Sequence, residues 1–208
     1  LNMTRTDLAC DCCARAGQDK KHTGEAPRAS AQQGEGVWTM DTSGKWPKGR
    51  FSGNRFFAVI TAPNNKAVYA VGLKRKRDIL KVLRRFRVQW MRETGEKMEV
   101  FRSDRGGENM GRLFAAFCEE FDIKQDFTSP NSSSGNSETY IGVLQDNLRA
   151  SLNQAGMGLS YWEESLGGCV LALDLMPCAP LDQLSMYEHR TGQKPRLFDL
   201  HPLGAWCT

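Results

Sequence analysis

The chain has 208 residues, of which 40% are hydrophobic and 25% charged, and its formal net charge is +4. This composition suits one globular domain, with or without an appendage. No apolar run reaches the roughly 18 residues that a membrane-spanning helix needs, and no apolar segment follows a basic start, so neither a transmembrane protein nor a secretory signal is predicted. The sequence opens at Leu1 rather than Met, as a piece of a longer polypeptide would.

The seven cysteines are unevenly placed, with three clustered near the N-terminus and four standing singly among apolar residues. This is not the pattern of a disulfide framework, so we expect a reducing intracellular compartment, nuclear or cytoplasmic. Residues 17–36 contain no large apolar side chain. They are therefore predicted to be a linker between a short Cys-rich segment and the rest of the chain.

Three β-prone runs follow the linker, at residues 37–43, 54–62 and 66–74. The sequence Pro63-Asn64-Asn65 between the last two is typical of a turn. A helix is predicted over residues 77–93, because apolar residues recur there at helical spacing: Ile79, Leu83, Phe86 and Trp90.

The second half of the chain alternates strands with helices. Strands are predicted at 97–103 and 123–128, and further helices at about 138–155 and 160–176. The helix between the two strands is expected to bury one apolar face, made of Leu113, Phe114, Phe117 and Phe121. Three strands followed by this alternation indicate an α/β fold, in which helices flank a mixed sheet.

One segment is intensely basic. Between Lys66 and Arg92, ten basic residues accompany a single acid, a local charge of +9. With so few acids, i, i+4 ion pairs cannot neutralise the helix surface. The segment is predicted either to follow the phosphates of a nucleic acid or to be an ordinary solvated helix face, and we give the two interpretations equal weight. The candidate nucleic-acid-binding residues are Lys74, Lys76, Arg77, Lys81, Arg84 and Arg85.

Two acids stand where predicted strands end. Asp41 lies near the end of the first strand, and Asp104 follows the fourth and precedes two glycines. If these strands are neighbours, the two carboxylates can reach one cation, and Glu138 at the start of a helix adds a third. Three carboxylates suit two Mg²⁺ or Mn²⁺ ions that clamp a phosphodiester displacement. Spacing alone favours the plainer interpretation, a turn-forming Asp and a Glu that complements the helix dipole.

Several segments match one known family in order and spacing. The most specific is VFRSDRGGEN (100–109), which contains Asp104. Further matches are WTMDTSG (38–44), GNRFFAVITAPNNKAVYAVGLKRK (53–76), FCEEFDIKQDFTSP (117–130), MYEHRTGQKP (186–195) and LHPLGAWC (200–207). From Cys10 to its end, the chain resembles the integrase region of copia-type LTR retrotransposon Pol polyproteins.

The resemblance implies an RNase H-like fold and a metal-dependent polynucleotidyl transferase that trims the 3′ ends of element DNA and joins them to target DNA. It implies Asp41, Asp104 and Glu138 as catalytic carboxylates holding two Mg²⁺ or Mn²⁺ ions. Its implied partners are DNA and further copies of the chain, with no membrane. The implied domains are a zinc-module remnant at 1–16, a linker at 17–36, the catalytic core at 37–178 and the start of a C-terminal extension at 179–208.

The chain departs from the family pattern in three places. Only 33 residues separate Asp104 from Glu138, where the family has roughly 35. Thr139-Tyr140-Ile141 replaces DNA-facing basic residues after the Glu, and Cys10 and Cys13 lack the preceding His pair that would complete a zinc site. We expect an eroded copy, whose strand transfer is weak or absent. The alternatives are a catalytically inactive DNA-binding or interaction module, and an RNase H-like nuclease that cleaves without joining.

Overall fold

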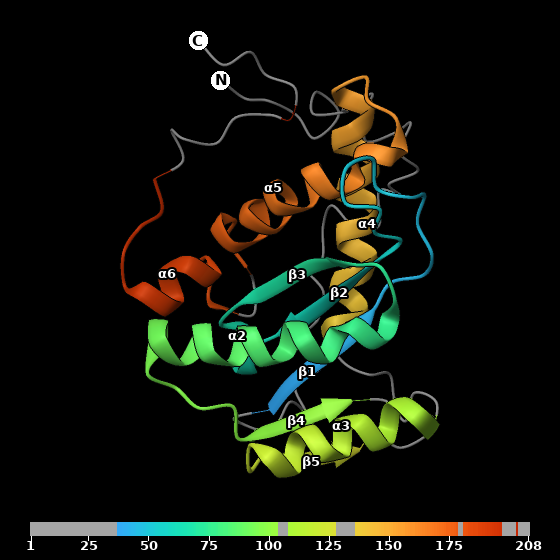
Figure 1. Cartoon of the computed structure of the whole chain (residues 1–208). Coiled ribbons are helices and arrows are strands. Elements are labelled where there is room, and N and C mark those ends of the chain that lie inside the picture. The colour runs from blue at the N-terminus through green and yellow to red at the C-terminus, as the bar shows by residue number, and fades with distance from the viewer. Residues whose placement is uncertain (1–36, 104–107, 128–135, 179–180, 197–202, 204–208) are drawn as a thin grey trace.

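The computed structural model describes residues 37–103, 108–127, 136–178, 181–196 and 203. At its centre is a mixed five-stranded sheet with the strand order β3-β2-β1-β4-β5 (Figure 1). The antiparallel part comprises β1 (Val37–Thr42), β2 (Phe56–Thr61) and β3 (Val68–Leu73). The parallel part continues from β1 through β4 (Val100–Ser103) to β5 (Lys124–Phe127).

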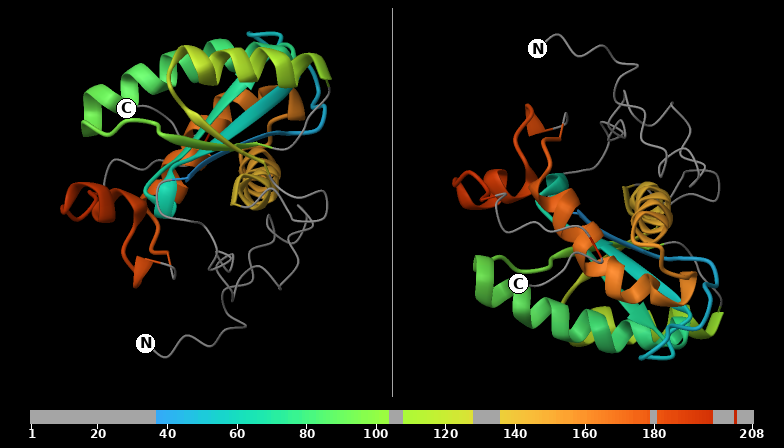
Figure 2. Two further views of the ribbon diagram at one scale, coloured as in Figure 1. Left: turned by 90° about the horizontal axis from the view of Figure 1, so that it is seen from below. Right: turned by 90° about the horizontal axis from the view of Figure 1, so that it is seen from above.

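Helices cover both faces of the sheet (Figure 2). On one face lie α2 (Ile79–Thr94) and α3 (Glu108–Glu120), and on the other α4 (Asn136–Gln154) and α5 (Trp162–Leu175). The short helix α6 (Met186–Thr191) packs against α5. The described residues also include three 3-10 turns: η2 (Pro63–Asn65), η3 (Lys76–Asp78) and η4 (Leu159–Tyr161).

The core under α2 and α3 is rich in aromatic rings. Strand alternation turns Trp38 and Phe101 toward this face, where they share a buried cluster with Leu83, Phe86 and Trp90 of α2 and with Phe114 and Phe117 of α3. The Trp38 ring meets the Trp90 ring edge to face, at 4.9 Å between centroids. The predicted inner stripe of α2 is therefore confirmed, since all four of its residues are buried.

The core under α4 and α5 is formed by the opposite set of strand residues. Phe57 and Val59 of β2 share a buried cluster with Leu144 and Leu148 of α4 and with Trp162 of α5. Helix α6 joins this core through Met186, and Arg190 forms a bidentate ion pair with Asp174 of α5, at 2.9 and 3.0 Å. The two cores together fix the sheet between its helical layers.

The predicted α/β architecture is confirmed, with element ends shifted by a few residues. Helix α4 begins at Asn136, two residues before its expected start, and α6 was not predicted. One expected core residue was wrong: Leu113 is 55% exposed, because the buried stripe of α3 runs through Phe114, Phe117 and Cys118 instead. In the part of the chain that the structure describes, no helix is long and apolar enough to cross a membrane.

Candidate functional site

Asp41 lies near the C-terminal end of β1, the central strand of the sheet. Its antiparallel partner is Val59, which belongs to the core under α4 and α5. Because directly opposite residues of an antiparallel pair project to the same side, the half-buried Asp41 side chain points to the α4 face. There its Oδ1 accepts a hydrogen bond from the Thr42 backbone N–H at 2.6 Å.

The first turn of α4 brings Glu138 to the same face. Helix α4 packs across β1 and β2, and it is anchored by Tyr140 and Ile141, which are buried in the cluster that contains Val59. Burial raises the pKa of the Tyr140 hydroxyl above its ordinary value, so this side chain is neutral. Glu138 itself is exposed. Basic, DNA-facing residues were expected at positions 139–141. Tyr140 and Ile141 belong instead to the core, whereas Thr139 is exposed.

The parallel pairing of β1 with β4 bears on the position of Asp104. Val37, Trp38 and Thr39 of β1 lie opposite Val100, Phe101 and Arg102 of β4, so both strands end at the same edge of the sheet. Asp104, the residue after β4, lies outside the described residues, as do Cys10 and Cys13. Among the described residues, no group of three His, Cys, Asp or Glu side chains is arranged to hold a metal ion.

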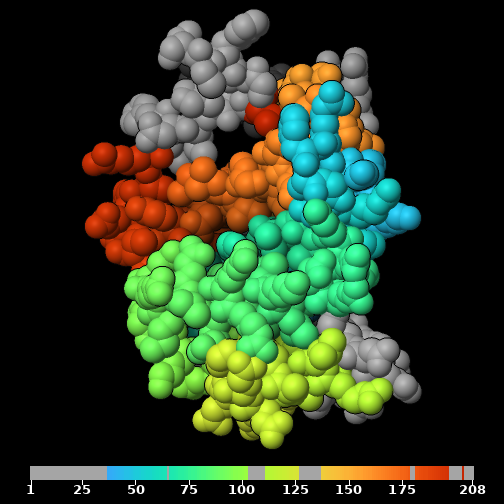
Figure 3. All heavy atoms as spheres, in the orientation of Figure 1, coloured from blue at the N-terminus to red at the C-terminus, as the bar shows by residue number. Residues whose placement is uncertain are grey.

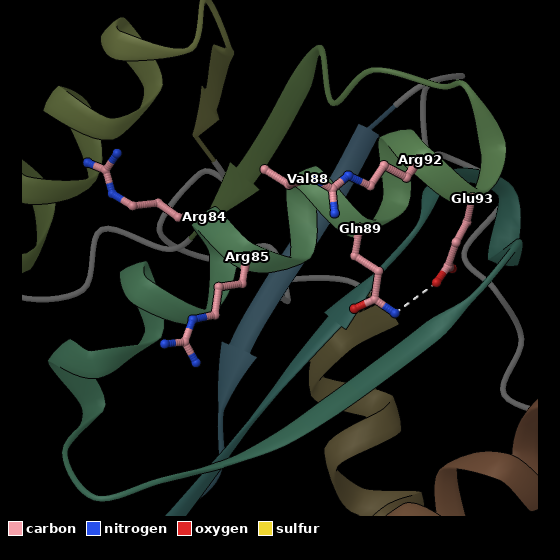
Figure 4. Close-up of a pocket in the computed structure, with 6 residues that line it drawn as sticks. All are labelled: Arg84, Arg85, Val88, Gln89, Arg92 and Glu93. Carbon is pink, nitrogen blue, oxygen red and sulfur yellow. Dashed lines mark hydrogen bonds between the residues drawn. The ribbon is translucent and has the colours of Figure 1, made fainter.

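The predicted nucleic-acid-binding residues lie on the other side of the sheet. Arg77, Lys81, Arg84 and Arg85 are exposed as expected, but α2 covers the face opposite α4. Arg84, Arg85 and Arg92 line a shallow hollow along the outer surface of α2 (Figure 4). Within that hollow, the Gln89 side chain donates to Glu93 at 2.8 Å.

Two of the candidates already have partners within the fold. The Arg84 guanidinium donates to Glu120 at 2.5 Å, which lowers the pKa of that carboxyl, and it lies over the Phe121 ring. Lys76 lies over the Phe56 ring, 5.9 Å from its centroid. Lys74, at the end of β3, is exposed.

No known protein-family profile matches the chain. Over 131 residues, or 62% of its length, it is 28% identical to the retrovirus-related Pol polyprotein from transposon TNT 1-94 of Nicotiana tabacum, of which the match spans 10%. This chain contains an integrase-like region.

Solved structures agree on the fold of this integrase-like region. The catalytic core domain of BIV integrase superposes with a TM-score of 0.51 and 18% identity, covering 76% of this chain and 95% of that one. A chain of the simian T-cell lymphotropic virus intasome in complex with PP2A regulatory subunit B56 gamma gives 0.59 and 16% identity, covering 85% and 62%. The fold is therefore RNase H-like, as predicted.

One structural contact of the integrase-like region was missed in the sequence. The Glu163 carboxylate, in the first turn of α5, accepts hydrogen bonds from the side chains of Ser52 and Asn54. These bonds tie the connection between β1 and β2 to α5 beside Gly72 of β3. The available signal was Gly72 itself, because a glycine inside a strand often marks a close approach by another group.

Replacing Gly72 with Ala is expected to break this tie. A Cβ there would overlap the Glu163 carboxylate and lie 2.6 Å from Asn54 Nδ2, so both side chains must move. We expect a loss of about 1.5–3 kcal/mol in the free energy of unfolding, the range for hydrogen bonds to a charged group. Urea denaturation measures it. Gly142→Ala is the matched control, since a Cβ at that α4 position meets nothing within 4 Å; equal losses in the two variants would contradict the prediction.

Proposed function

We propose that the integrase-like region is the catalytic domain of a retrotransposon integrase, which processes the 3′ ends of element DNA and transfers them into target DNA. One observation carries this proposal. The Asp41 side chain, at the end of the central strand, projects to the face on which the first turn of α4 presents Glu138. Two carboxylates from distant parts of the chain are therefore carried by elements on one side of the sheet, and this placement supports the proposal.

The donor chemistry of these residues fits a divalent ion. Asp41 and Glu138 offer the carboxylate oxygens that Mg²⁺ and Mn²⁺ prefer, and the proposal assigns Asp104 as the third ligand. When bound, two such ions would neutralise the charge that develops on the attacking and leaving oxygens. The protein's own task is to hold the carboxylates rigidly, and β1 and the buried side chains of α4 supply that rigidity.

We further propose that this chain is an eroded copy with weak strand transfer. The segment between Asp104 and Glu138 is shorter than the family pattern, while Tyr140 and Ile141 fix the start of α4 from the core side. A shortened connection to a fixed helix can misplace the Glu138 carboxylate, and a displacement of about 1 Å can cost about 10²-fold in rate.

A strand-transfer assay with element-end DNA and Mn²⁺ tests the proposal. We expect slow, metal-dependent joining that is lost on Asp104→Asn. Robust turnover would contradict erosion, and cleavage without joining would favour a different RNase H-like nuclease.

A catalytically inactive DNA-binding module is the second candidate. The exposed cations of α2 favour it, because α2 covers the face opposite Asp41 and its cations need no metal to attract phosphates. The distinguishing result is DNA affinity that falls steeply with salt in a chain with no metal-dependent activity. We also propose self-association, supported by the exposed apolar side chains of Leu171 in α5 and of Met176 directly after it.

A further inference from the structure

Residues 44–55, which form all but the first residue of the connection between β1 and β2, have an unusual surface. This segment contains four basic residues and no acid, and all four are exposed: Lys45, Lys48, Arg50 and Arg55. None of them forms an ion pair with a residue that the structure describes. At its tip, Phe51 is 76% exposed, the highest fraction among the large apolar residues described. We call this segment the 44–55 loop.

The loop is tightly held, so the exposure of Phe51 does not reflect a loose segment. Backbone hydrogen bonds close it on itself, from Trp46 N to Arg55 O at 2.7 Å and from Gly49 N to Asn54 O at 2.8 Å. It is also fastened to the helical layer, since the Trp162 indole donates to Pro47 O at 2.9 Å. A loop held in this way can bind a partner through its exposed ring with little cost for ordering the segment.

The surroundings of Phe51 form a stacking platform. Its ring meets that of Tyr161 edge to face, at 6.1 Å between centroids, and the Arg50 guanidinium lies 5.4 Å from the Tyr161 centroid. The carboxylate of Glu163, which contacts the loop, accepts hydrogen bonds from the side chains of Ser52 and Asn54. Aromatic rings flanked by cations are the means by which proteins bind unpaired nucleic-acid strands, through base stacking and phosphate attraction.

The loop is connected to the candidate site along α4. Arg149 of α4 lies over the Trp46 ring of the loop, 5.7 Å from its centroid. Arg149 and Glu138 are eleven residues apart on one helix, which places them near the same side at an axial separation of about 16 Å. That distance corresponds to about five nucleotides of one strand at the spacing of duplex DNA.

The same loop adjoins the basic end of β3. The Arg55 backbone N–H donates to Leu73 O at 2.9 Å, immediately before Lys74. In the space-filling view, the loop lies against this end of the sheet (Figure 3). The loop therefore lies between the cations that follow β3 and helix α4, and it contacts both segments.

We propose that the 44–55 loop binds an unpaired DNA strand: Phe51 stacks on a base, and Lys48, Arg50 and Arg55 contact the adjoining phosphates. The choice of DNA as partner rests on the proposed function, whereas the binding itself needs no catalysis.

Fluorescence anisotropy with two labelled DNAs tests this assignment. One is a blunt 20-base-pair duplex, and the other is the same duplex with a five-nucleotide single-stranded extension. The wild-type chain is expected to bind the extended duplex more tightly. Phe51→Ala is expected to weaken that binding at least about 5-fold while leaving the affinity for the blunt duplex unchanged, since stacking on one aromatic ring is worth at least this factor per base. Phe51→Trp is expected to restore the preference.

Leu113→Ala is the matched control, because Leu113 is an exposed apolar residue on α3, away from the loop. It should leave both affinities unchanged. An undiminished preference of Phe51→Ala for the extended duplex would overturn the assignment. An equal loss of affinity for both DNAs would also overturn it, and would indicate a duplex or an acidic protein as the partner. Failure of the proposed function gives a different result, namely absent strand transfer with the preference for the extended duplex intact.

Discussion

Replacing Asp41 with Asn is expected to lower metal-dependent strand transfer by about 10²- to 10³-fold, the usual loss when one charge-stabilising group is removed from an active site. Asn keeps the size of the side chain and an oxygen that can accept the 2.6 Å hydrogen bond from Thr42 N, so β1 should be undisturbed. What is lost is a negative ligand for the metal. The Mn²⁺-dependent rise in melting temperature should therefore shrink as well.

DNA affinity supplies the contrasting measurement for Asp41→Asn. Removing a negative charge should leave the affinity unchanged or raise it, most clearly at low salt. Asp122→Asn is the matched control, because this exposed turn residue has φ 53°, a conformation that Asn adopts readily. If Asp41→Asn and Asp122→Asn were equally active, Asp41 would have no role in metal binding. If neither the variants nor the wild type bound DNA, the integrase and the DNA-binding proposals would both be wrong.

The order of the elements from β1 to α5 was predictable from the hydrophobic pattern, whereas α6 was not. The period of Ile79, Leu83, Phe86 and Trp90 gave the orientation of α2, and the β-prone runs gave all five strands. Leu113 was wrongly predicted to be buried because it lies next to the residues of α3 that are buried. Which of these neighbouring residues faces the core depends on the elements that the helix packs against. Periodicity does not contain that tertiary information.

The candidate site was predictable only in part. Strand ends and the family resemblance nominated Asp41 and Glu138 as candidates. Their placement on one face depends on the pairing of β1 with β2 and on the packing of α4 across both strands, which no local pattern encodes. The 44–55 loop was overlooked because its meaning arises from contacts distant in the sequence. Ser52 and Asn54 are separated from Glu163 by more than a hundred residues, so neither composition nor spacing connects them.

Trp162→Ala is expected to lower the free energy of unfolding by about 3–5 kcal/mol, the range for removing a buried aromatic side chain. Trp162 is 0% exposed, and its ring lies 5.9 Å from that of Trp46 and 6.1 Å from that of Phe57, between α5 and the sheet. Since small domains have only about 5–15 kcal/mol of stability, this loss is a large share. Chemical denaturation followed by circular dichroism measures it.

A conservative variant separates the contributions of packing and hydrogen bonding at this position. Trp162→Phe keeps most of the buried ring but removes the indole N–H that bonds to Pro47 O, so most of the stability should remain, with a loss of about 1–3 kcal/mol. Leu159→Ala, at a 46% exposed position in the preceding turn, should change stability by less than about 0.5 kcal/mol. Because Pro47 belongs to the 44–55 loop, Trp162→Phe should also weaken binding of the extended duplex by freeing the loop. A folded Trp162→Phe chain with wild-type preference for that DNA would mean that the Pro47 hydrogen bond does not position Phe51.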